Sequence, residues 1–266
     1  MAKIKVRGLT KSFQAIKGET VDAISGLSFD VGENEFVSIV GPSGCGKSTL
    51  LYIVAGFITP TKGDVRIGGT PIAGPGPDRG IVFQEYALFP WKTVQDNVKY
   101  GLEEKRLPRE EQERIVRKYI RLMGLDGFQH KYPKELSGGM KQRVALARTL
   151  AYDPDVLLMD EPFGALDAQT RELQQDQLLS VWRERKKTVL LVTHSVDEAV
   201  YLSERVLVMT ARPGRIKSVV DIALDRSRSR EEIVTSAEFA ALRNRVWLEV
   251  REEVLKHYDG VREGPR

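Results

Sequence analysis

The sequence predicts an α/β fold, in which helices cover a mostly parallel sheet and a helical segment is inserted between its strands. Helical patterns at 47–55 and 171–184 separate apolar runs, so strands and helices alternate. From about 88 to 150 the pattern is helical throughout, which predicts the insertion. The apolar runs lack the alternation of a half-exposed strand, as is typical of strands covered on both faces. These runs are residues 35–40, 155–159 and 188–193.

Outside the first apolar run, the N-terminal third predicts short strands joined by turns. Residues 1–8 are charged and indicate an edge strand, and turns are expected at Gly18 and Gly26. Residues 61–84 return to short strands, because glycine and proline interrupt this segment repeatedly.

Helical spacing predicts the elements of the insertion and of the C-terminal part. Residues 110–123 carry apolar side chains at helical spacing, with Gly124 as the stop, and a second helix should begin at Ser137. Residues 225–230 indicate a polar linker before a long amphipathic helix. The apolar stripe of that helix is expected to pack on the protein's own body, with docking of a partner as the alternative. The stripe consists of Phe239, Leu242, Val246, Val250 and Val254.

The composition is that of an ordinary globular protein. There are 41 Lys and Arg against 37 Asp and Glu, a net charge of +4, which is too small for 266 residues to indicate a nucleic-acid partner. The hydrophobic share of 41% excludes a disordered chain, and a single cysteine excludes an internal disulfide. The longest apolar stretch, residues 50–58, is shorter than the roughly 20 residues that span a membrane. A protein of the reducing cytosol is therefore expected.

Residues 41–48 fit the phosphate-binding pattern G-x-x-x-x-G-K-[ST], between a buried strand and a helix. Glycines let backbone N–H groups turn toward phosphate oxygens, and the helix start adds its positive dipole end. Lys47 is expected to reach the β- and γ-phosphates of a nucleotide, and Ser48 to ligate magnesium. A chance glycine-rich turn is the alternative, which the strand–loop–helix context disfavours. The predicted loop residues are Gly41, Pro42, Ser43, Gly44, Cys45, Gly46, Lys47, Ser48 and Thr49.

Two carboxylates follow the second apolar run. Ligands collect at the C-terminal ends of strands in open α/β sheets. Asp160 suits a role beside magnesium, and Glu161 is placed to orient or deprotonate a water molecule. Such a pair can also serve as a helix cap or in a salt bridge, but the phosphate loop in the same chain favours the catalytic interpretation.

The segment from Leu136 to Arg143, LSGGMKQR, resembles the signature motif of ATP-binding cassette (ABC) ATPases. Its serine and two glycines open a helix and form a second anion site, with an ordinary helix start as the alternative. The phosphate loop and the signature are thus two anion sites at opposite ends of the helical insertion. In a head-to-tail dimer, the signature of each chain would close over the ATP bound at the partner's phosphate loop. The signature residues are Ser137, Gly138, Gly139 and Gln142.

The resemblance covers the chain to about residue 216 and implies roles for further residues. Gln84 matches the glutamine loop that senses magnesium and links to the membrane partner, and Asp167, in Ala165-Leu-Asp167, matches the loop that touches the opposite subunit. Phe13 matches the aromatic that stacks on adenine, although a core aromatic is the alternative. The implied catalytic residues are Glu161, Lys47 and His194, the last matching the switch histidine near the γ-phosphate. The implied magnesium ligands are Ser48, Gln84 and Asp160.

The same resemblance implies a P-loop NTPase core with an N-terminal antiparallel β subdomain and an inserted α-helical subdomain. The expected ABC ATPase domain is 1–225, followed by an amphipathic helical extension at 226–266 and by no large regulatory domain.

Finer resemblance narrows the branch of the family. Residues 87–94, 197–205 and 211–216 look like those of ATPase subunits of importers for nitrate, sulfonates, taurine and related small anions. In that branch residues 85–91 lie by the groove that receives a helix of the permease. Their apolar side chains are Tyr86, Leu88, Phe89 and Trp91, which favours docking, with packing inside the helical insertion as the alternative.

Cys45 lies inside the phosphate loop. A small residue that simply fits the loop is the plain interpretation. We also expect that backbone amides and Lys47 lower the pKa of its thiol, so that alkylation would block ATPase activity and ATP would protect.

The resemblance as a whole implies an ATPase that uses ATP and Mg²⁺ at the interface of a homodimer. The implied partners are a transmembrane permease and, indirectly, an external solute-binding protein, at the cytoplasmic face of the inner membrane. A soluble ABC ATPase acting on DNA or ribosomes is the alternative, but the chain has no heptads, no cysteine cluster and one phosphate loop, so no nucleic acid is expected. A regulator without turnover is disfavoured by the presence of Glu161 and His194.

Overall fold

The computed structural model describes residues 2–14, 19–164 and 166–262. The chain divides into two compact units. The first unit joins residues 1–76 to residues 187–266, and the second contains residues 77–186. The predicted helical insertion at 88–150 falls inside the second unit.

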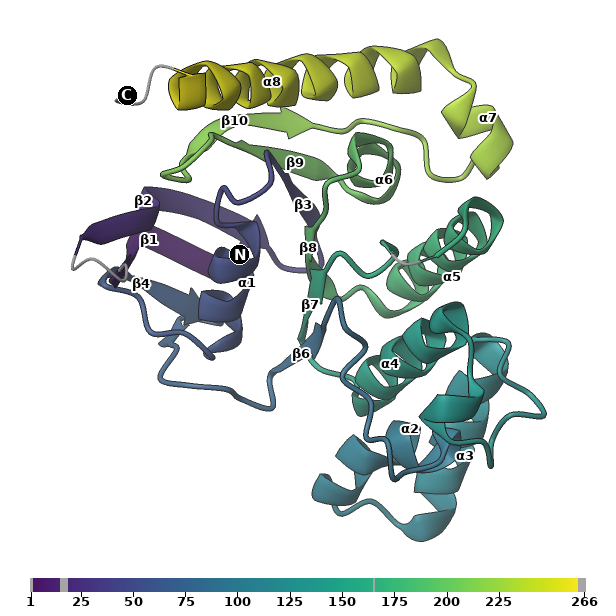
Figure 1. Cartoon of the computed structure of the whole chain (residues 1–266). Coiled ribbons are helices and arrows are strands. Elements are labelled where there is room, and N and C mark those ends of the chain that lie inside the picture. Colours follow the sequence, from purple (N-terminus) through teal and green to yellow (C-terminus); the bar gives the residue numbers. More distant parts are fainter. Residues whose placement is uncertain (1, 15–18, 165, 263–266) are drawn as a thin grey trace. The chain divides into compact units, whose positions relative to one another are not determined.

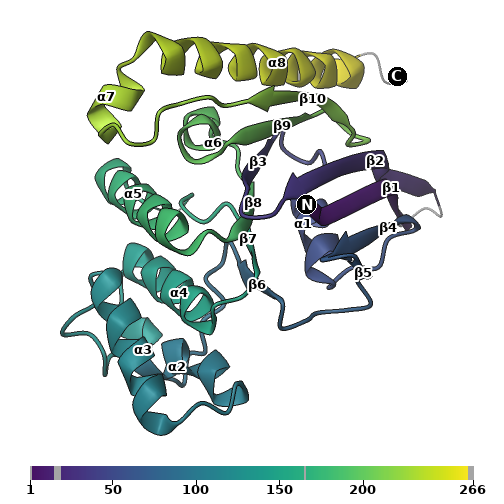
Figure 2. The same ribbon diagram turned by 180° about the vertical axis from the view of Figure 1, so that it is seen from behind.

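The first unit contains an antiparallel sheet in the order β2 (Thr20–Gly32), β1 (Ala2–Gln14), β4 (Lys62–Ile67), β5 (Thr70–Pro71) (Figure 2). The predicted edge strand at 1–8 is wrong, because Val6 of β1 pairs with Phe29 of β2 on one side and with Val65 of β4 on the other. Side chains such as Val6 are fully buried, which outweighs the charges beside them.

Gly26 does not form the predicted turn, because β2 continues through it. The register between β1 and β2 shifts at this point, and Gly26 has a φ of +63°, which is the geometry of a β-bulge. The predicted turn at Gly18 lies outside the described residues.

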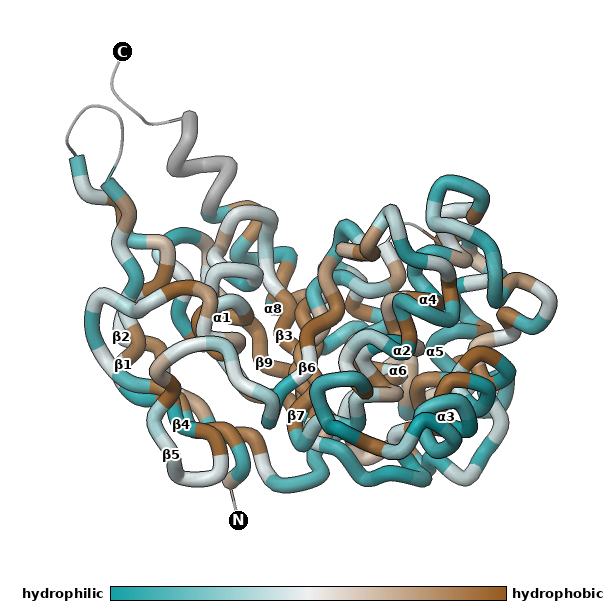
Figure 3. Tube along the Cα trace, turned by 90° about the horizontal axis from the view of Figure 1, so that it is seen from below, coloured by the Kyte–Doolittle hydropathy of each residue, from teal (hydrophilic) through white to brown (hydrophobic). Residues whose placement is uncertain are grey.

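The second sheet of this unit has β3 (Phe36–Val40) between β8 (Thr188–Val192) and β9 (Arg205–Met209), all parallel, with β10 (Ile216–Asp221) antiparallel to β9. Every residue of β3 and β8 is buried, and Figure 3 shows hydrophobic residues along β3 and β9. Helices α1 (Lys47–Ala55) and α6 (Val196–Leu202) pack on this sheet. The predicted strands at 35–40 and 188–193 and the predicted helix at 47–55 are confirmed.

The C-terminal part of the first unit forms α7 (Arg230–Val234) and the long helix α8 (Ala237–Arg262). Helix α8 packs against α6 and β9 and runs along β10 (Figure 1). Phe239 and Val246 of the predicted apolar stripe are buried, so the stripe packs on the protein's own body. Trp247 and Leu248 stay exposed on another side of the helix. In the part of the chain that the structure describes, no helix is long and apolar enough to cross a membrane.

The second unit combines two parallel strands with helices. Strands β6 (Arg79–Val82) and β7 (Val156–Asp160) pair in parallel. Helices α2 (Val94–Glu104), α3 (Arg109–Leu122) and α4 (Gly138–Tyr152) pack against one another. A 3₁₀ turn, η1 (Pro133–Glu135), precedes α4, and α5 (Ala168–Arg185) follows β7. The predicted helix at 110–123 and its stop are confirmed, because α3 ends at Leu122 and Gly124 adopts a φ of +60°.

Removing a buried side chain of α8 should destabilise the first unit. We expect Phe239→Ala, at a side chain that is 5% exposed, to lower the free energy of unfolding by about 3–5 kcal/mol. Trp247→Ala is the matched control, because this aromatic side chain on the same helix is 47% exposed and should cost far less. Urea unfolding followed by circular dichroism measures both, and equal losses would contradict the burial of Phe239 beneath α8.

Candidate functional site

The loop between β3 and α1 is closed around the side chain of Lys47. Its ammonium group donates to the carbonyl oxygens of Gly41 at 2.8 Å and Pro42 at 2.9 Å, and the residue is 7% exposed. The N–H of Cys45 donates to the Pro42 carbonyl at 3.4 Å, which forms the turn of the loop. The loop therefore holds a positive charge at the N-terminal end of a helix, where N–H groups have no acceptor within the helix.

Gly46 has to be glycine for two reasons. It has a φ of +98°, and a Cβ added there would lie 2.8 Å from the carbonyl oxygen of Ala23 on β2. Gly46, the N-cap of α1, offers no side-chain acceptor to the first amides of the helix. A loop with these properties suits phosphate oxygens.

His194 lies at the same edge of the sheet as the phosphate loop. Ile39 of β3 pairs with Val192 of the parallel neighbour β8. Gly41 and His194 each stand two residues further along these strands, so the register brings them to the same level. His194 is exposed, and Ser195 after it caps α6 by accepting from the Glu198 N–H.

In the second unit, the parallel pair β6 and β7 brings Gln84 and Glu161 together in the same way. Val82 pairs with Met159, and Gln84 and Glu161 each follow two residues later. The Gln84 side-chain amide donates to the Glu161 carboxylate at 3.5 Å. Glu161 has a φ of +46°, an unusual value for a residue with a side chain, and Asp160 before it is buried at 1% exposure. The acidic pair thus combines a buried residue, Asp160, with a half-buried one, Glu161.

The signature residues open α4 as predicted. Ser137 is the N-cap, and its hydroxyl accepts from the Met140 N–H at 3.3 Å. The two glycines allow close neighbours: a Cβ on Gly138 would lie 3.1 Å from the Tyr86 hydroxyl, and one on Gly139 would lie 3.2 Å from Leu166. Gln142 lies one turn into α4 and is buried, at 2% exposure.

The remaining predicted residues occupy exposed positions. Asp167 caps α5 and accepts from the Thr170 N–H at 3.0 Å, and hydrogen bonds from the Thr170 backbone and hydroxyl lower the pKa of this carboxyl. Ala165, in the same motif, lies outside the described residues. Phe13 is 44% exposed near the end of β1, with the Lys11 ammonium 5.1 Å from its ring centre, so it is no core aromatic.

The packing alternative for the apolar segment at 85–91 holds in part. Phe89 packs inside the helical unit, 4.4 Å from the Tyr100 ring and 5.5 Å from the Arg148 guanidinium. Trp91, in contrast, is 71% exposed. The segment therefore offers an aromatic side chain to solvent while a neighbouring aromatic ring anchors it.

Sequence reasoning missed Arg148, which fastens this segment to the signature helix. Its guanidinium donates to the carbonyl oxygens of Ala87 at 2.8 Å and Tyr86 at 3.3 Å. These two residues have φ values of +45° and +41°, and the arginine holds their carbonyls in that conformation. A charged residue between Ala147 and Thr149, both buried on α4, is the signal that would have identified it.

The thiol of Cys45 is less acidic than the sequence predicts. Burial raises its pKa and outweighs the Lys47 ammonium, which lies 3.9 Å from the sulfur and lowers it. The expectation of a lowered pKa is therefore wrong, because the residue is only 1% exposed. The plain interpretation, a small residue that fits the loop, agrees with this environment.

Among the described residues no group of three or more His, Cys, Asp and Glu could hold a metal ion. The predicted magnesium ligands Ser48, Gln84 and Asp160 instead offer one hydroxyl, one amide oxygen and one carboxylate. This donor set suits Mg²⁺, which prefers hard oxygen ligands and commonly keeps one carboxylate together with phosphates and waters.

Comparison with known proteins yields one consistent family. A model of the ABC transporter family matches residues 24–164. An uncharacterized ABC transporter ATP-binding protein of Methanocaldococcus jannaschii is 55% identical over 96% of the chain and 93% of that protein. The nitrate import ATP-binding protein of Synechococcus elongatus is 48% identical over 88% of the chain and 86% of its own length. The taurine import ATP-binding protein of Roseobacter denitrificans is 44% identical over 96% of the chain and 97% of its own length.

The fold has close counterparts among solved structures. The dimeric structure of the ATP-binding cassette MJ0796, in a post-hydrolysis state bound to ADP and Pi, superimposes with a TM-score of 0.75. It is 32% identical in sequence and covers 84% of this chain and the whole of the other.

The single thiol should react slowly in the folded protein. At pH 7.5 we expect N-ethylmaleimide to modify Cys45 at least about tenfold more slowly in native protein than in protein unfolded by urea, since burial disfavours the thiolate. Mass spectrometry of quenched time points measures both rates, and each modification belongs to the one cysteine of the chain. Equal rates would mean that the thiol is accessible and activated.

Proposed function

Because the chain belongs to the ABC transporter family, we propose that it is the ATP-hydrolysing subunit of an importer for a small anion such as nitrate, a sulfonate or taurine. The observation that carries the proposal is the phosphate loop closed around Lys47, at the sheet edge that also holds His194. The similarity to nitrate and taurine import proteins, at 48% and 44% identity, supports the branch.

ATP binding is assigned to residues of the first unit. We assign the phosphates to the amides of residues 41–49 and to Lys47, whose ammonium would exchange its bonds to Gly41 and Pro42 for phosphate oxygens. Phe13 is assigned to the adenine ring, and its exposure supports this role, because a stacking partner must be accessible.

Hydrolysis is assigned to Glu161, His194 and Lys47. Glu161 orients or deprotonates the attacking water, and its contact with Gln84 supports the role because it orients the carboxylate. His194 holds the γ-phosphate and the water in line, and Lys47 stabilises the charge that develops on the phosphoryl oxygens.

Magnesium, when bound, would neutralise phosphate charge, and Ser48, Gln84 and Asp160 are the proposed ligands. The burial of Asp160 at the end of β7 supports its role, since a ligand carboxylate has to be held in one orientation.

A second copy of the chain is proposed to complete each nucleotide site. The signature, Ser137, Gly138 and Gly139, would contact the γ-phosphate of the ATP bound to the partner, with Asp167 close to the twofold axis. A helix start with two glycines supports this role because its backbone amides can donate to an anion that approaches closely. The dimeric structure of a similar cassette supports the arrangement.

The permease is proposed to dock on the segment at 85–91, with the chain as a peripheral protein on the cytoplasmic face of the inner membrane. The exposed Trp91 supports this docking, because a large apolar side chain on the surface is typical of an interface. An external solute-binding protein would then act through the permease.

Glu161→Gln should abolish turnover but leave ATP binding intact. The amide keeps the shape of the side chain and loses the base, so we expect phosphate release to fall by at least about a hundredfold. The variant should also accumulate as an ATP-bound dimer, which light scattering after gel filtration detects. Glu172→Gln, at an exposed carboxylate on α5, is the control and should retain activity and remain monomeric after turnover. Rapid hydrolysis by Glu161→Gln would refute the role of the base.

Copurification from the native host tests the transporter assignment. A tagged chain extracted in mild detergent should recover a multi-span permease, identified by mass spectrometry, which could then be tested with candidate anions. Trp91→Ala should reduce that recovery, whereas Trp247→Ala, at an exposed tryptophan on α8, should not. Recovery of ribosomes or DNA-bound proteins in place of a permease would favour the soluble alternative.

A further inference from the structure

The phosphate loop contacts the turn between β9 and β10, residues 210–215, with backbone against backbone. A Cβ added to Gly214 would lie 2.1 Å from the carbonyl oxygen of Cys45, and one added to Gly41 would lie 3.0 Å from that of Met209, at the end of β9. Gly214 does not adopt the left-handed conformation, so it is close packing that requires glycine there. Because the two backbones approach this closely, a shift of the β9–β10 turn would displace the loop.

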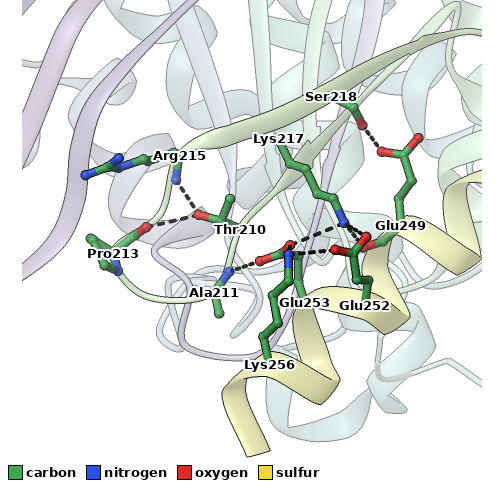
Figure 4. A network of polar contacts seen from close by, with 10 residues as sticks. All are labelled: Thr210, Ala211, Pro213, Arg215, Lys217, Ser218, Glu249, Glu252, Glu253 and Lys256. Carbon is green, nitrogen blue, oxygen red and sulfur yellow. Dashed lines mark hydrogen bonds and ion pairs between the residues drawn. The ribbon is translucent and has the colours of Figure 1, made fainter. Parts of the chain in front are cut away.

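The β9–β10 turn is held rigidly on its inner side. The Gly214 N–H donates to the Ala23 carbonyl at 2.9 Å, and the Ser25 N–H donates to the Gly214 carbonyl at 3.1 Å, which ties the turn to β2. The Thr210 hydroxyl closes the turn: it accepts from the Arg215 N–H and donates to the Pro213 carbonyl, both at 3.0 Å (Figure 4). These bonds connect Thr210, next to Ala211, with Pro213 and Arg215, which flank Gly214.

On its outer side, α8 holds the turn through Glu253. Figure 4 shows this side chain reaching from the helix to the Ala211 N–H, which donates to it at 3.2 Å. Glu253 also pairs with Lys217 at 3.2 Å and Lys256 at 3.0 Å, although its side chain is only 6% exposed. A buried carboxylate is costly unless several donors meet it, and here three do.

The charge state of Glu253 agrees with a carboxylate that accepts from three donors. Burial by itself raises the pKa of the carboxyl, but hydrogen bonds from Lys256, the Ala211 N–H and Lys217 outweigh it and lower the pKa. The group is therefore ionised at neutral pH.

Glu252 provides a natural comparison one residue earlier. It pairs with the same two lysines, with Lys217 at 2.7 Å and Lys256 at 2.6 Å, but its side chain is 54% exposed. Glu252 thus shares the charges of the network, whereas Glu253 is the member that bonds to the backbone of the turn.

We propose that Glu253 of α8 is a positioning residue for the phosphate loop, acting through the β9–β10 turn and the contact between Gly214 and Cys45. The inference rests on the proposed function, since it takes this loop as the element that binds the phosphates of ATP. Helix α8 thereby sets the affinity for ATP from outside the nucleotide site.

Steady-state ATPase measurements on the full chain test the role of Glu253. In Glu253→Ala the Ala211 N–H loses its acceptor, so we expect KM for ATP to rise about fivefold to tenfold with kcat within about twofold. Glu253→Gln keeps an oxygen that accepts from Ala211 and should restore KM to within about twofold. Glu252→Ala, the matched control, should leave KM unchanged. A merely structural role would lower kcat per mole of protein and the melting temperature at constant KM, which would overturn the proposal.

A second variant does not depend on α8. Gly214→Ala places a methyl group against the Cys45 carbonyl and should weaken binding of Mg-ATP, measured by isothermal titration calorimetry, by about tenfold or more. Gly74→Ala is the control, because a Cβ there meets no atom within 4 Å. Unchanged affinity in Gly214→Ala, with the wild-type chain binding ATP, would refute the inference alone. Absence of ATP binding by the wild-type chain would refute the proposed function itself.

Discussion

Close contact between backbones beneath the phosphate loop is the constraint on which the functional part of this protein depends. Gly46 approaches Ala23, Gly41 approaches Met209, and the Cys45 carbonyl approaches Gly214. A phosphate cradle needs amides fixed in position before the ligand arrives, and side chains between the layers would allow them to move. Glycines at these contacts therefore serve rigidity as much as they serve conformational freedom.

Parallel strands impose a second constraint, because their C-terminal ends meet at one edge. In the first unit the register of β3 and β8 brings the loop and His194 to the same level. In the second unit the register of β6 and β7 does the same for Gln84 and Glu161, whose side chains touch. In each unit the pairing of buried strands places the polar groups at one level of the sheet edge. The burial of those strands stabilises the arrangement.

The helical part of the second unit connects an exposed segment with the signature. Arg148 of α4 binds the carbonyls of Tyr86 and Ala87, and the Tyr86 hydroxyl approaches Gly138 at the start of the same helix. A force applied to the segment at 85–91 would reach the signature through these contacts. Such a connection suits a protein that couples nucleotide chemistry to movement of a partner.

The sequence by itself determined the order of strands and helices, the phosphate loop, the acidic pair and the signature, because each depends on local spacing and residue type. The bounds of α1 agree with the expectation, since a glycine-rich start and Gly56 define both ends locally. Tertiary structure alone decided that β1 lies inside its sheet, that Gly26 is a bulge and that burial raises the pKa of Cys45. It also decided the roles of Arg148, Gly214 and Glu253, whose partners lie on other elements, far away along the chain. Pairing partners and burial arise from contacts between distant segments, which local patterns along the chain do not encode.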